Sequence, residues 1–167
     1  MPYRNKTYVS FDGDNDIHYY WLMRAWKQSD MTSFNFYDAH DLNTASDTSL
    51  ESSIKRQLAD RLRNSKSFIL LAGERTRFLY KFVRWEIEQA VTRDLPIIVV
   101  NLNGLRFMDE SRCPPLLKSQ LAVHVSFNAH IIEHALEDWT QQHLGFRYQG
   151  KTGPFYYREA VYQGLGL

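Results

Sequence analysis

Two short runs of almost uninterrupted apolar residues constrain the fold of this chain more than any other feature. They are SFILLAG, at residues 67–73, and IIVVNL, at residues 97–102. A strand covered on one face alternates apolar and polar residues, whereas a strand covered on both faces is apolar throughout. Both runs are therefore predicted to be central strands of a parallel sheet that is sandwiched between two layers of helices.

Strands and helices are predicted to alternate along the whole chain. The clearest helix, within residues 49–65, repeats Leu50, Ile54, Leu58 and Leu62 at four-residue steps. Five strand–helix alternations are typical of the α/β class, and we expect a flavodoxin-like, open, mostly parallel sheet of five strands in the order 2-1-3-4-5. Besides the two apolar runs, the expected strands are Lys6–Phe11, Phe34–Ala39 and Leu121–Phe127, and the other helices are Ile17–Gln28, Phe78–Arg93 and Asn128–Gln142.

The length of 167 residues favours a single domain. Its core is expected at about residues 6–143, followed by an aromatic, glycine-containing extension at 144–167 that shows no period. The extension carries Phe155, Tyr156, Tyr157 and Tyr162. We expect these aromatic residues to close the core, and the alternative is that they form an assembly surface.

Charge and cysteine usage exclude several classes of protein. Twenty Lys and Arg residues oppose nineteen Asp and Glu residues, so the basic excess of a nucleic-acid or anionic-membrane binder is missing. No apolar run approaches the ~18 residues of a membrane span. Cys113 is the single cysteine, and the polar start, Met1–Lys6, precedes no apolar leader segment. We therefore expect a protein of a reducing compartment, the cytoplasm.

Standard nucleotide-binding and metal motifs are not supported. The chain has no G-x-G-x-x-G, no P-loop and no G-x-S-x-G motif. Asp12, Asp14 and Asp16 have the spacing of an EF-hand, but Ile17 and Met23 stand where glycine and a bidentate glutamate are required. We expect a turn or helix cap there, and hydrogen bonding to sugar hydroxyls is the functional alternative.

The segment HIIEH, at residues 130–134, formally matches an inverted zinc-peptidase motif. Helical geometry places Ile132 and Trp139 on an apolar stripe and turns His130 and His134 to the opposite, outer face. Only a short stretch of chain remains to supply a third ligand. We therefore predict no metal site.

The segment FVRWEIEQA, at residues 82–90, places two glutamates on one predicted helix. At about 100° per residue, with Val83 at the centre of the apolar stripe, Glu88 falls on the far side beside Arg84. These two residues are four apart, and they are expected to form an exposed ion pair worth a few tenths of a kcal/mol.

Glu86 falls about 60° from Val83, at the margin of the apolar stripe. Three aromatic residues lie beside it: Phe78, Phe82 and Trp85. Two interpretations stay open at this point. Glu86 is either a boundary residue paired with Arg75 or Arg77, or a partly desolvated functional carboxylate. Spacing alone favours the boundary residue.

Four segments taken together resemble the bacterial TIR-like domains of the Thoeris ThsB type. They are TYVSFDGDND at the first strand, GERT after the third, RWEIEQA on the next helix and PIIVV at the fourth strand. The resemblance covers about Lys6 to Leu102 and rests on the order and spacing of these segments. It implies a flavodoxin-like fold and cleavage of the nicotinamide–ribose bond of NAD+. It also implies a cyclic ADP-ribose-type second messenger that activates a partner effector in anti-phage defence.

The same resemblance assigns roles to individual residues. The catalytic glutamate of the family lies in an aromatic-Val-Arg-aromatic-Glu-Ile pattern, which maps onto Glu86 and not onto Glu88. The residue four before it is commonly Trp in TIR domains and is Phe82 here. NAD+ is then a substrate, with no further cofactor. The positions expected to line the nucleotide pocket are Ser10, Phe11 and Asp12, with Phe82 and Trp85 as an aromatic wall.

Two other functions are compatible with the sequence. The first is a non-enzymatic TIR-type interaction module, and because TIR-like sites are often completed by a neighbouring subunit, assembly into a homo-oligomer is compatible with both this module and the enzyme. The second is a receiver-type phosphoacceptor that would use Asp12 or Asp38. It lacks the matching lysine at the fifth strand, where HVSF stands instead.

Overall fold

The computed structural model describes residues 6–29, 35–37, 39 and 51–167. Among these residues no helix combines the length and the apolar character that crossing a membrane requires. Strands, helices and two 3-10 turns follow one another as β1 Lys6–Ser10, α1 Ile17–Gln28, β2 Asn35–Tyr37, α2 Glu51–Arg63, β3 Ser67–Ala72, η2 Thr76–Phe78, α3 Val83–Thr92, β4 Ile97–Asn101, η3 Pro115–Leu117, β5 Ala122–Ser126, α4 Ala129–Tyr148, β6 Pro154–Tyr156 and α5 Glu159–Gly164.

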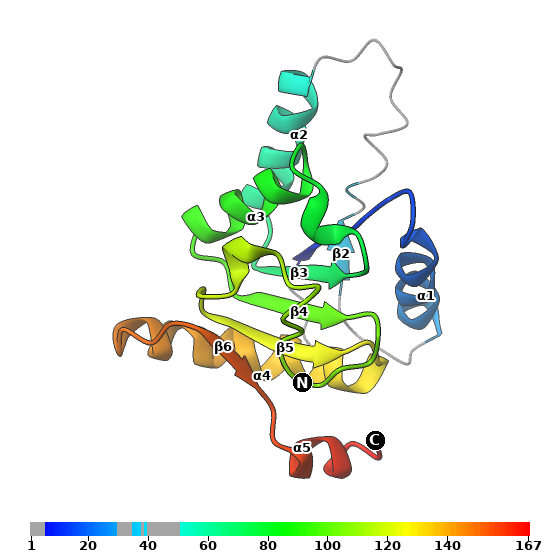
Figure 1. The fold of residues 1–167 in the computed structure, drawn as a ribbon, viewed down its shortest axis with the longest axis vertical. Coiled ribbons are helices and arrows are strands. Elements are labelled where there is room, and N and C mark those ends of the chain that lie inside the picture. The colour runs from blue at the N-terminus through cyan, green and yellow to red at the C-terminus, as the bar shows by residue number, and fades with distance from the viewer. Residues whose placement is uncertain (1–5, 30–34, 38, 40–50) are drawn as a thin grey trace.

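One parallel sheet organises the described residues, with its strands in the order β2-β1-β3-β4-β5-β6 (Figure 1). The α/β class, the flavodoxin-like order and the parallel arrangement are confirmed. The prediction of five strands is wrong by one, because β6 adds to the edge beside β5. Its three residues, Pro154–Tyr156, are too few to show the alternation that marks a strand in a sequence.

Successive side chains of the central strands point to opposite faces of the sheet, and both faces are buried, which explains the apolar composition of these strands. Val9, Ile69 and Leu71 belong to one buried cluster, which α1 and α4 cover. Tyr8, Phe68 and Leu70 belong to a second cluster, on the opposite face, which α2 and α3 cover. Each central strand thus buries both sets of side chains, as the apolar runs predict. Figure 1 shows α2 and α3 side by side over one part of the sheet.

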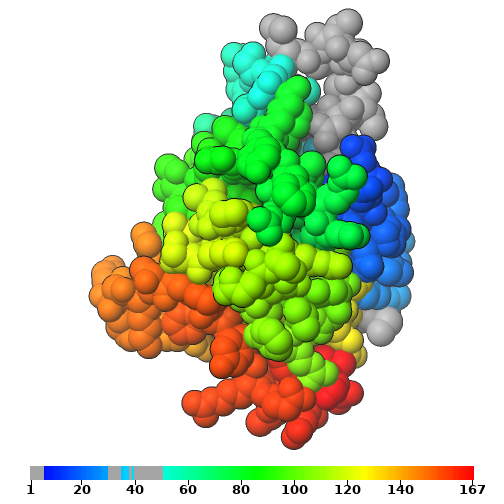
Figure 2. Space-filling view, in the orientation of Figure 1, coloured from blue at the N-terminus to red at the C-terminus, as the bar shows by residue number. Residues whose placement is uncertain are grey.

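The C-terminal extension completes the first cluster. Phe155, Tyr157 and Tyr162 pack against it, as expected for core closure, whereas Tyr156 is 64% exposed. Helix α4 continues to Tyr148, beyond the predicted end at Gln142. Figure 2 shows the extension at one end of the molecule, opposite α2.

Helix α3 begins at Val83 and not at Phe78 as predicted. The chain first makes the 3-10 turn η2, where the Thr76 hydroxyl accepts a hydrogen bond from the Gly73 amide and donates one to the Leu71 carbonyl. Phe82 is the N-cap residue of α3. The helical positions assigned to Phe78 and Phe82 from the sequence are therefore wrong, while those from Val83 onward hold.

Candidate functional site

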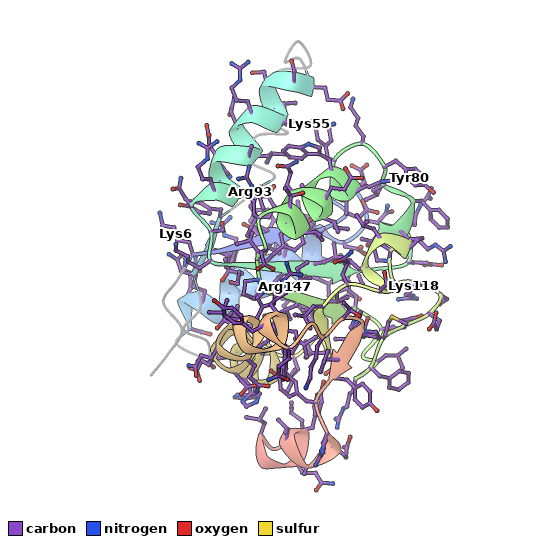
Figure 3. The ribbon with its side chains drawn as sticks, turned by 90° about the vertical axis from the view of Figure 1, so that its left-hand side faces the viewer. Lys6, Lys55, Tyr80, Arg93, Lys118 and Arg147 are labelled. Carbon is purple, nitrogen blue, oxygen red and sulfur yellow. The ribbon has the colours of Figure 1, made fainter. Side chains whose placement is uncertain are left out.

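A cavity of about 530 Å³ opens at the carboxyl end of β1. Its walls come from the β1–α1 loop, the first residue of α1, Leu58 of α2, the segment before α3 and the first turns of α3. In Figure 3, Tyr80 projects from the segment that leads into α3. The lining residues are Phe11, Asp12, Gly13, Asp14, Ile17, Ala39, Leu58, Phe78, Leu79, Tyr80, Lys81, Phe82, Val83 and Glu86. The volume lies within the range of ligand cavities in proteins.

Glu86 is a buried carboxylate in the wall of this cavity. It stands in the first turn of α3, is only 5% exposed and lines the cavity. Its Oε2 atom is buried without a hydrogen-bond partner among the described residues. None of the described cations forms an ion pair with it, so the expected pairing with Arg75 or Arg77 is not found. The Arg77 guanidinium instead donates a hydrogen bond to the Ser111 carbonyl.

Two hydroxyl groups lie beneath Glu86, on the face of β1 that points toward α3. Tyr8 and Ser10 are two residues apart on this strand, so their side chains share one face. Both are fully buried, and neither lines the cavity. Within the described part of the chain neither hydroxyl makes a hydrogen bond of standard geometry, and there Tyr8 Oη, Ser10 Oγ and Glu86 Oε2 are buried oxygens without a partner.

Burial raises the pKa of Glu86 to about 7, and the nearby Tyr8 and Ser10 hydroxyls act in the opposite direction. Without a cation beside it, the carboxylate loses hydration and gains little in exchange, so its neutral form is favoured. The pKa of the Tyr8 phenol is raised in turn, first by burial and then by the negative charge of Glu86. Tyr8 therefore keeps its proton, and its O–H group is available as a donor to a charge on Glu86. Strongly shifted carboxyls in cavities are characteristic of functional sites.

The other glutamate of α3 behaves as predicted. Glu88 Oε1 lies 3.1 Å from the Arg84 Nε atom, and both side chains are largely exposed. This pair is confirmed as an ordinary surface contact. The spacing in FVRWEIEQA thus correctly separates a solvent-facing glutamate from a buried one.

The acidic loop after β1 forms a turn, as expected. Asp12 is buried, and its Oδ1 atom accepts hydrogen bonds from the amides of Asp14 and Asn15 while Oδ2 accepts one from the Asn15 side chain. These contacts hold both Asp12 oxygens inside the turn. Asp12 and Asp14 line the cavity, whereas Asp16 does not.

Asp16 instead fixes the loop to β3. Its carboxylate is buried directly over Gly73, and a Cβ atom built on Gly73 would lie only 2.1 Å from Asp16 Oδ2. Burial, followed by the charge of Asp12, raises the pKa of Asp16. The start of α1 is therefore pressed against the end of β3 where only a glycine leaves room.

The aromatic residues predicted for the site occupy different places. Phe11 lines the cavity but is 1% exposed, because its ring stacks on Tyr20 at a centroid distance of 4.7 Å. Phe82 also lines the cavity, with Lys81 above its ring. Trp85 does not: it packs against the α2–α3 cluster beneath Lys55. Of the predicted pocket residues, Phe11, Asp12, Phe82 and Glu86 therefore meet at the cavity, and Ser10 and Trp85 lie outside its lining.

Sequence reasoning placed Phe78 beside Glu86 but missed Tyr80 and Lys81, which with Phe78 form the mouth of the cavity. Phe78 and Tyr80 are 56% and 65% exposed, an unusual degree for large aromatic side chains, and both line it. Among the described lining residues, Lys81 alone carries a positive charge. A detectable signal was the segment RTRFLYKF, at residues 75–82, which interleaves cations with aromatic residues.

Other candidates from the sequence lie elsewhere. His130 is exposed, and His134 packs its ring against Tyr157. No group of three or more potential metal ligands is found among the described residues. Asp38 and the following loop, except Ala39, fall outside the described residues.

Comparison with known proteins agrees with this arrangement. Among curated proteins, none matches the chain. The family model described as the TIR-like domain of Thoeris protein ThsB matches residues 8–106, which is more than half of the chain and includes the end of β1, the mouth of the cavity and Glu86. The chain therefore belongs to the family of Thoeris ThsB TIR-like domains.

Proposed function

We propose that this chain cleaves the nicotinamide–ribose bond of NAD+ in anti-phage defence, with Glu86 as the catalytic residue. The proposal rests on one observation above all. A buried carboxylate with an unpaired oxygen and no cationic partner among the described residues forms part of the wall of a cavity of about 530 Å³. Such an arrangement is costly for folding, so its persistence indicates a chemical use.

A single carboxylate is sufficient for this reaction. Most glycosidases need two, because the leaving oxygen must be protonated. When the glycosidic bond of NAD+ breaks, its electron pair goes to the pyridinium nitrogen, and nicotinamide leaves neutral. The remaining task is to stabilise the positive charge that develops on the ribose and to orient the ribose hydroxyls. A preorganised carboxylate in a cavity shielded from water serves both purposes.

The ionisation of Glu86 then controls the reaction. With a pKa of about 7, the carboxyl is divided between its two forms near neutral pH. Only the ionised form stabilises positive charge on the ribose. We therefore expect kcat to rise with pH through about 7 and to level off above it.

The mouth of the cavity fits the rest of a dinucleotide. Lys81 offers one cation for the diphosphate, while Phe78 and Tyr80 offer exposed rings for a base to stack upon. Phe11 is fully packed and serves to exclude water. Exclusion of water favours attack by the adenine or a ribose hydroxyl of the substrate, which gives a cyclic ADP-ribose-type product. This product would act as a cytoplasmic second messenger for a partner effector.

The alternative, a non-enzymatic interaction module, loses most of the surface proposed for it. Of the four aromatic residues named for that surface, Phe155, Tyr157 and Tyr162 pack into the core and Tyr156 is largely exposed. Tyr148, at the end of α4 in the same extension, is also exposed. A second copy of the chain would have to dock elsewhere, and the exposed Phe78 and Tyr80 make the mouth of the cavity the favoured place.

The decisive experiment measures nicotinamide release and the nucleotide product by mass spectrometry. Wild type, Glu86→Gln and Glu88→Gln are incubated with NAD+ as purified proteins and are also expressed in phage-infected cells. Glutamine keeps the shape of glutamate but cannot stabilise a cation, so Glu86→Gln should lose at least about a hundredfold in rate. Glu88→Gln, the matched control two residues further along α3 on its solvent-exposed face, should remain close to wild type.

Two outcomes would contradict the proposal. The first is equal nicotinamide release by wild type and Glu86→Gln both in vitro and during infection. The second is loss of activity in Glu88→Gln with activity retained in Glu86→Gln.

A further inference from the structure

We infer that Tyr8 is a positioning residue for Glu86: its buried hydroxyl is the donor that holds the ionised carboxylate in place from beneath. The inference rests on the proposed function for its catalytic meaning. The physical relation between the two side chains can be measured without any turnover.

The placement of Tyr8 is determined by the packing of β1. The ring lies in the α2–α3 cluster and is stacked on Phe68, with ring centroids 5.7 Å apart and planes 8° from parallel. The register of β1 with β3 pairs these two residues directly. Stacked and fully buried, the ring has little freedom to turn, so its hydroxyl keeps one place near the Glu86 carboxyl. The Tyr8 hydroxyl oxygen and Glu86 Oε2 are both buried without a hydrogen-bond partner among the described residues, so each is available to the other.

Glu86 has few other sources of stabilisation. None of the described cations pairs with it, and one of its oxygens is unpaired. Tyr8 and Ser10 are the two hydroxyls whose hydrogen-bonding effect reaches the carboxyl, and Tyr8 has the larger effect. A buried anion is stabilised most by donors that are already oriented toward it. Tyr8, fixed by its stack on Phe68, meets that requirement.

Tyr8 must act through Glu86 and not on the ligand. It is 0% exposed and does not line the cavity, whereas Glu86 does. Removing the hydroxyl should therefore leave ligand contacts unchanged while making the carboxylate harder to ionise. Deletion is expected to raise the pKa of Glu86 above its present value and to move the rise of kcat to higher pH.

The direct test is a titration of the Glu86 side-chain carboxyl by carbon-13 NMR, with the signal assigned by its loss in Glu86→Gln. Tyr8→Phe keeps the stacked ring and removes only the hydroxyl. In this variant the titration midpoint of the Glu86 carboxyl should rise, because its proton affinity should be roughly tenfold higher than in wild type. Site-specific 3-fluorotyrosine at residue 8, a more acidic donor, should move the midpoint in the opposite direction.

Tyr162→Phe is the matched control, because Tyr162 is equally buried but belongs to the other face of the sheet. It should leave the Glu86 midpoint unchanged. In turnover assays Tyr8→Phe should lower kcat about fivefold at pH 7, recover at high pH and keep the KM of wild type.

An unchanged or lowered midpoint in Tyr8→Phe would overturn the inference, as would an equal shift in Tyr162→Phe. If the protein proves inactive toward NAD+, the proposed catalysis fails, but the titration still decides whether Tyr8 governs Glu86. If activity is present and the Glu86 midpoint does not move in Tyr8→Phe, the inference about Tyr8 is wrong while the proposed catalysis stands.

Discussion

The two faces of the sheet differ in the polarity of the strand side chains that they bury. Toward α1 and α4 the strands present aliphatic side chains such as Val9, Ile69 and Leu71, and large aromatic residues fill the space above them. Toward α2 and α3 the strands present Tyr8, Ser10 and His124. These three, together with Glu86 of α3, carry buried polar atoms that have no hydrogen-bond partner among the described residues. On the other face Trp139 of α4 carries one such atom, its Nε1, but none of the described strand residues does.

The difference separates the part of the molecule that stabilises the fold from the part that can carry chemistry. Well-packed apolar surface is the main stabilising contribution in a domain. Buried unpaired polar atoms reduce stability, and proteins retain them where activity requires them. We therefore expect substitutions on the α1–α4 face to alter stability and substitutions on the α2–α3 face to alter activity.

The largest effect on stability should come from Trp139→Ala. Trp139 is fully buried and packs against Phe146 and Phe155, which joins α4 to β6. Its loss should cost about 3–5 kcal/mol in the free energy of unfolding. Denaturant unfolding measures this cost, and activity per folded molecule should be unchanged at a temperature where the variant is folded. A specific loss of activity would break the division between the faces.

The next effect is a pH dependence that comes from the α2–α3 face. Burial lowers the pKa of His124 to about 4, and burial raises that of Glu86 to about 7. As the pH falls from 6.5 toward 4, the unfolded chain protonates at His124 before the native chain does, so stability falls. As the pH rises from 4.5 toward 7, the unfolded chain ionises at Glu86 first, so stability again falls. Each contribution amounts to about 3 kcal/mol.

Between about pH 4.5 and 6.5 these two contributions have opposite slopes and should cancel. Unfolding free energies measured across pH 4–9 should therefore reveal each one only when the other is removed. Relative to wild type, Glu86→Gln should gain stability above pH 7, and His124→Leu should gain it below pH 5. Parallel curves for wild type and Glu86→Gln would contradict the raised pKa of Glu86.

The smallest effect concerns the mouth of the cavity. Lys81 and Lys55 both interact with the Glu51 carboxylate, at 3.8 and 2.9 Å, but only Lys81 lines the cavity. Lys81→Met should raise the KM for NAD+ about tenfold, as expected for loss of a phosphate contact. Lys55→Met should have little effect on KM. A similar change in both variants would point to general electrostatics and not to a contact with the ligand. In Figure 3, Lys55 lies on α2, away from Tyr80 at the mouth.

The central sheet was predictable because a strand that is buried on both faces appears in the sequence as an almost uninterrupted apolar run. The runs at β3 and β4 could scarcely be anything but interior strands. Strand β6 was not predictable: its residues alternate between exposed and half-buried positions over too short a length. The start of α3 was misplaced because Phe78 and Leu79 continue the apolar spacing of the helix. In the structure these residues belong to or follow the separate 3-10 turn η2, where Thr76 bonds back to Leu71 and Gly73, and the helix begins only at Val83.

The candidate site was predictable in part. Spacing separated Glu86 from Glu88, because both lie within the regular part of α3. The relation of Tyr8 to Glu86 could not be foreseen, because it depends on how α3 packs over β1, and in the sequence Tyr8 is one more aromatic strand residue. Trp85 was misjudged for a related reason. A small rotation about the helix decides whether a flanking aromatic residue faces the cavity or α2.

Gly73 shows how far the constraint of such a site extends beyond the groups that would touch a ligand. It is not part of the lining of the cavity that Glu86 faces, yet the Asp16 carboxylate occupies the space where any side chain would begin. We therefore expect substitutions at the two positions to be coupled: an alanine at 73 should become tolerable only after residue 16 has shortened or moved. In a library of single variants selected for function, position 73 should thus be as depleted as Glu86, the residue that we propose to be catalytic, for a reason that is purely spatial.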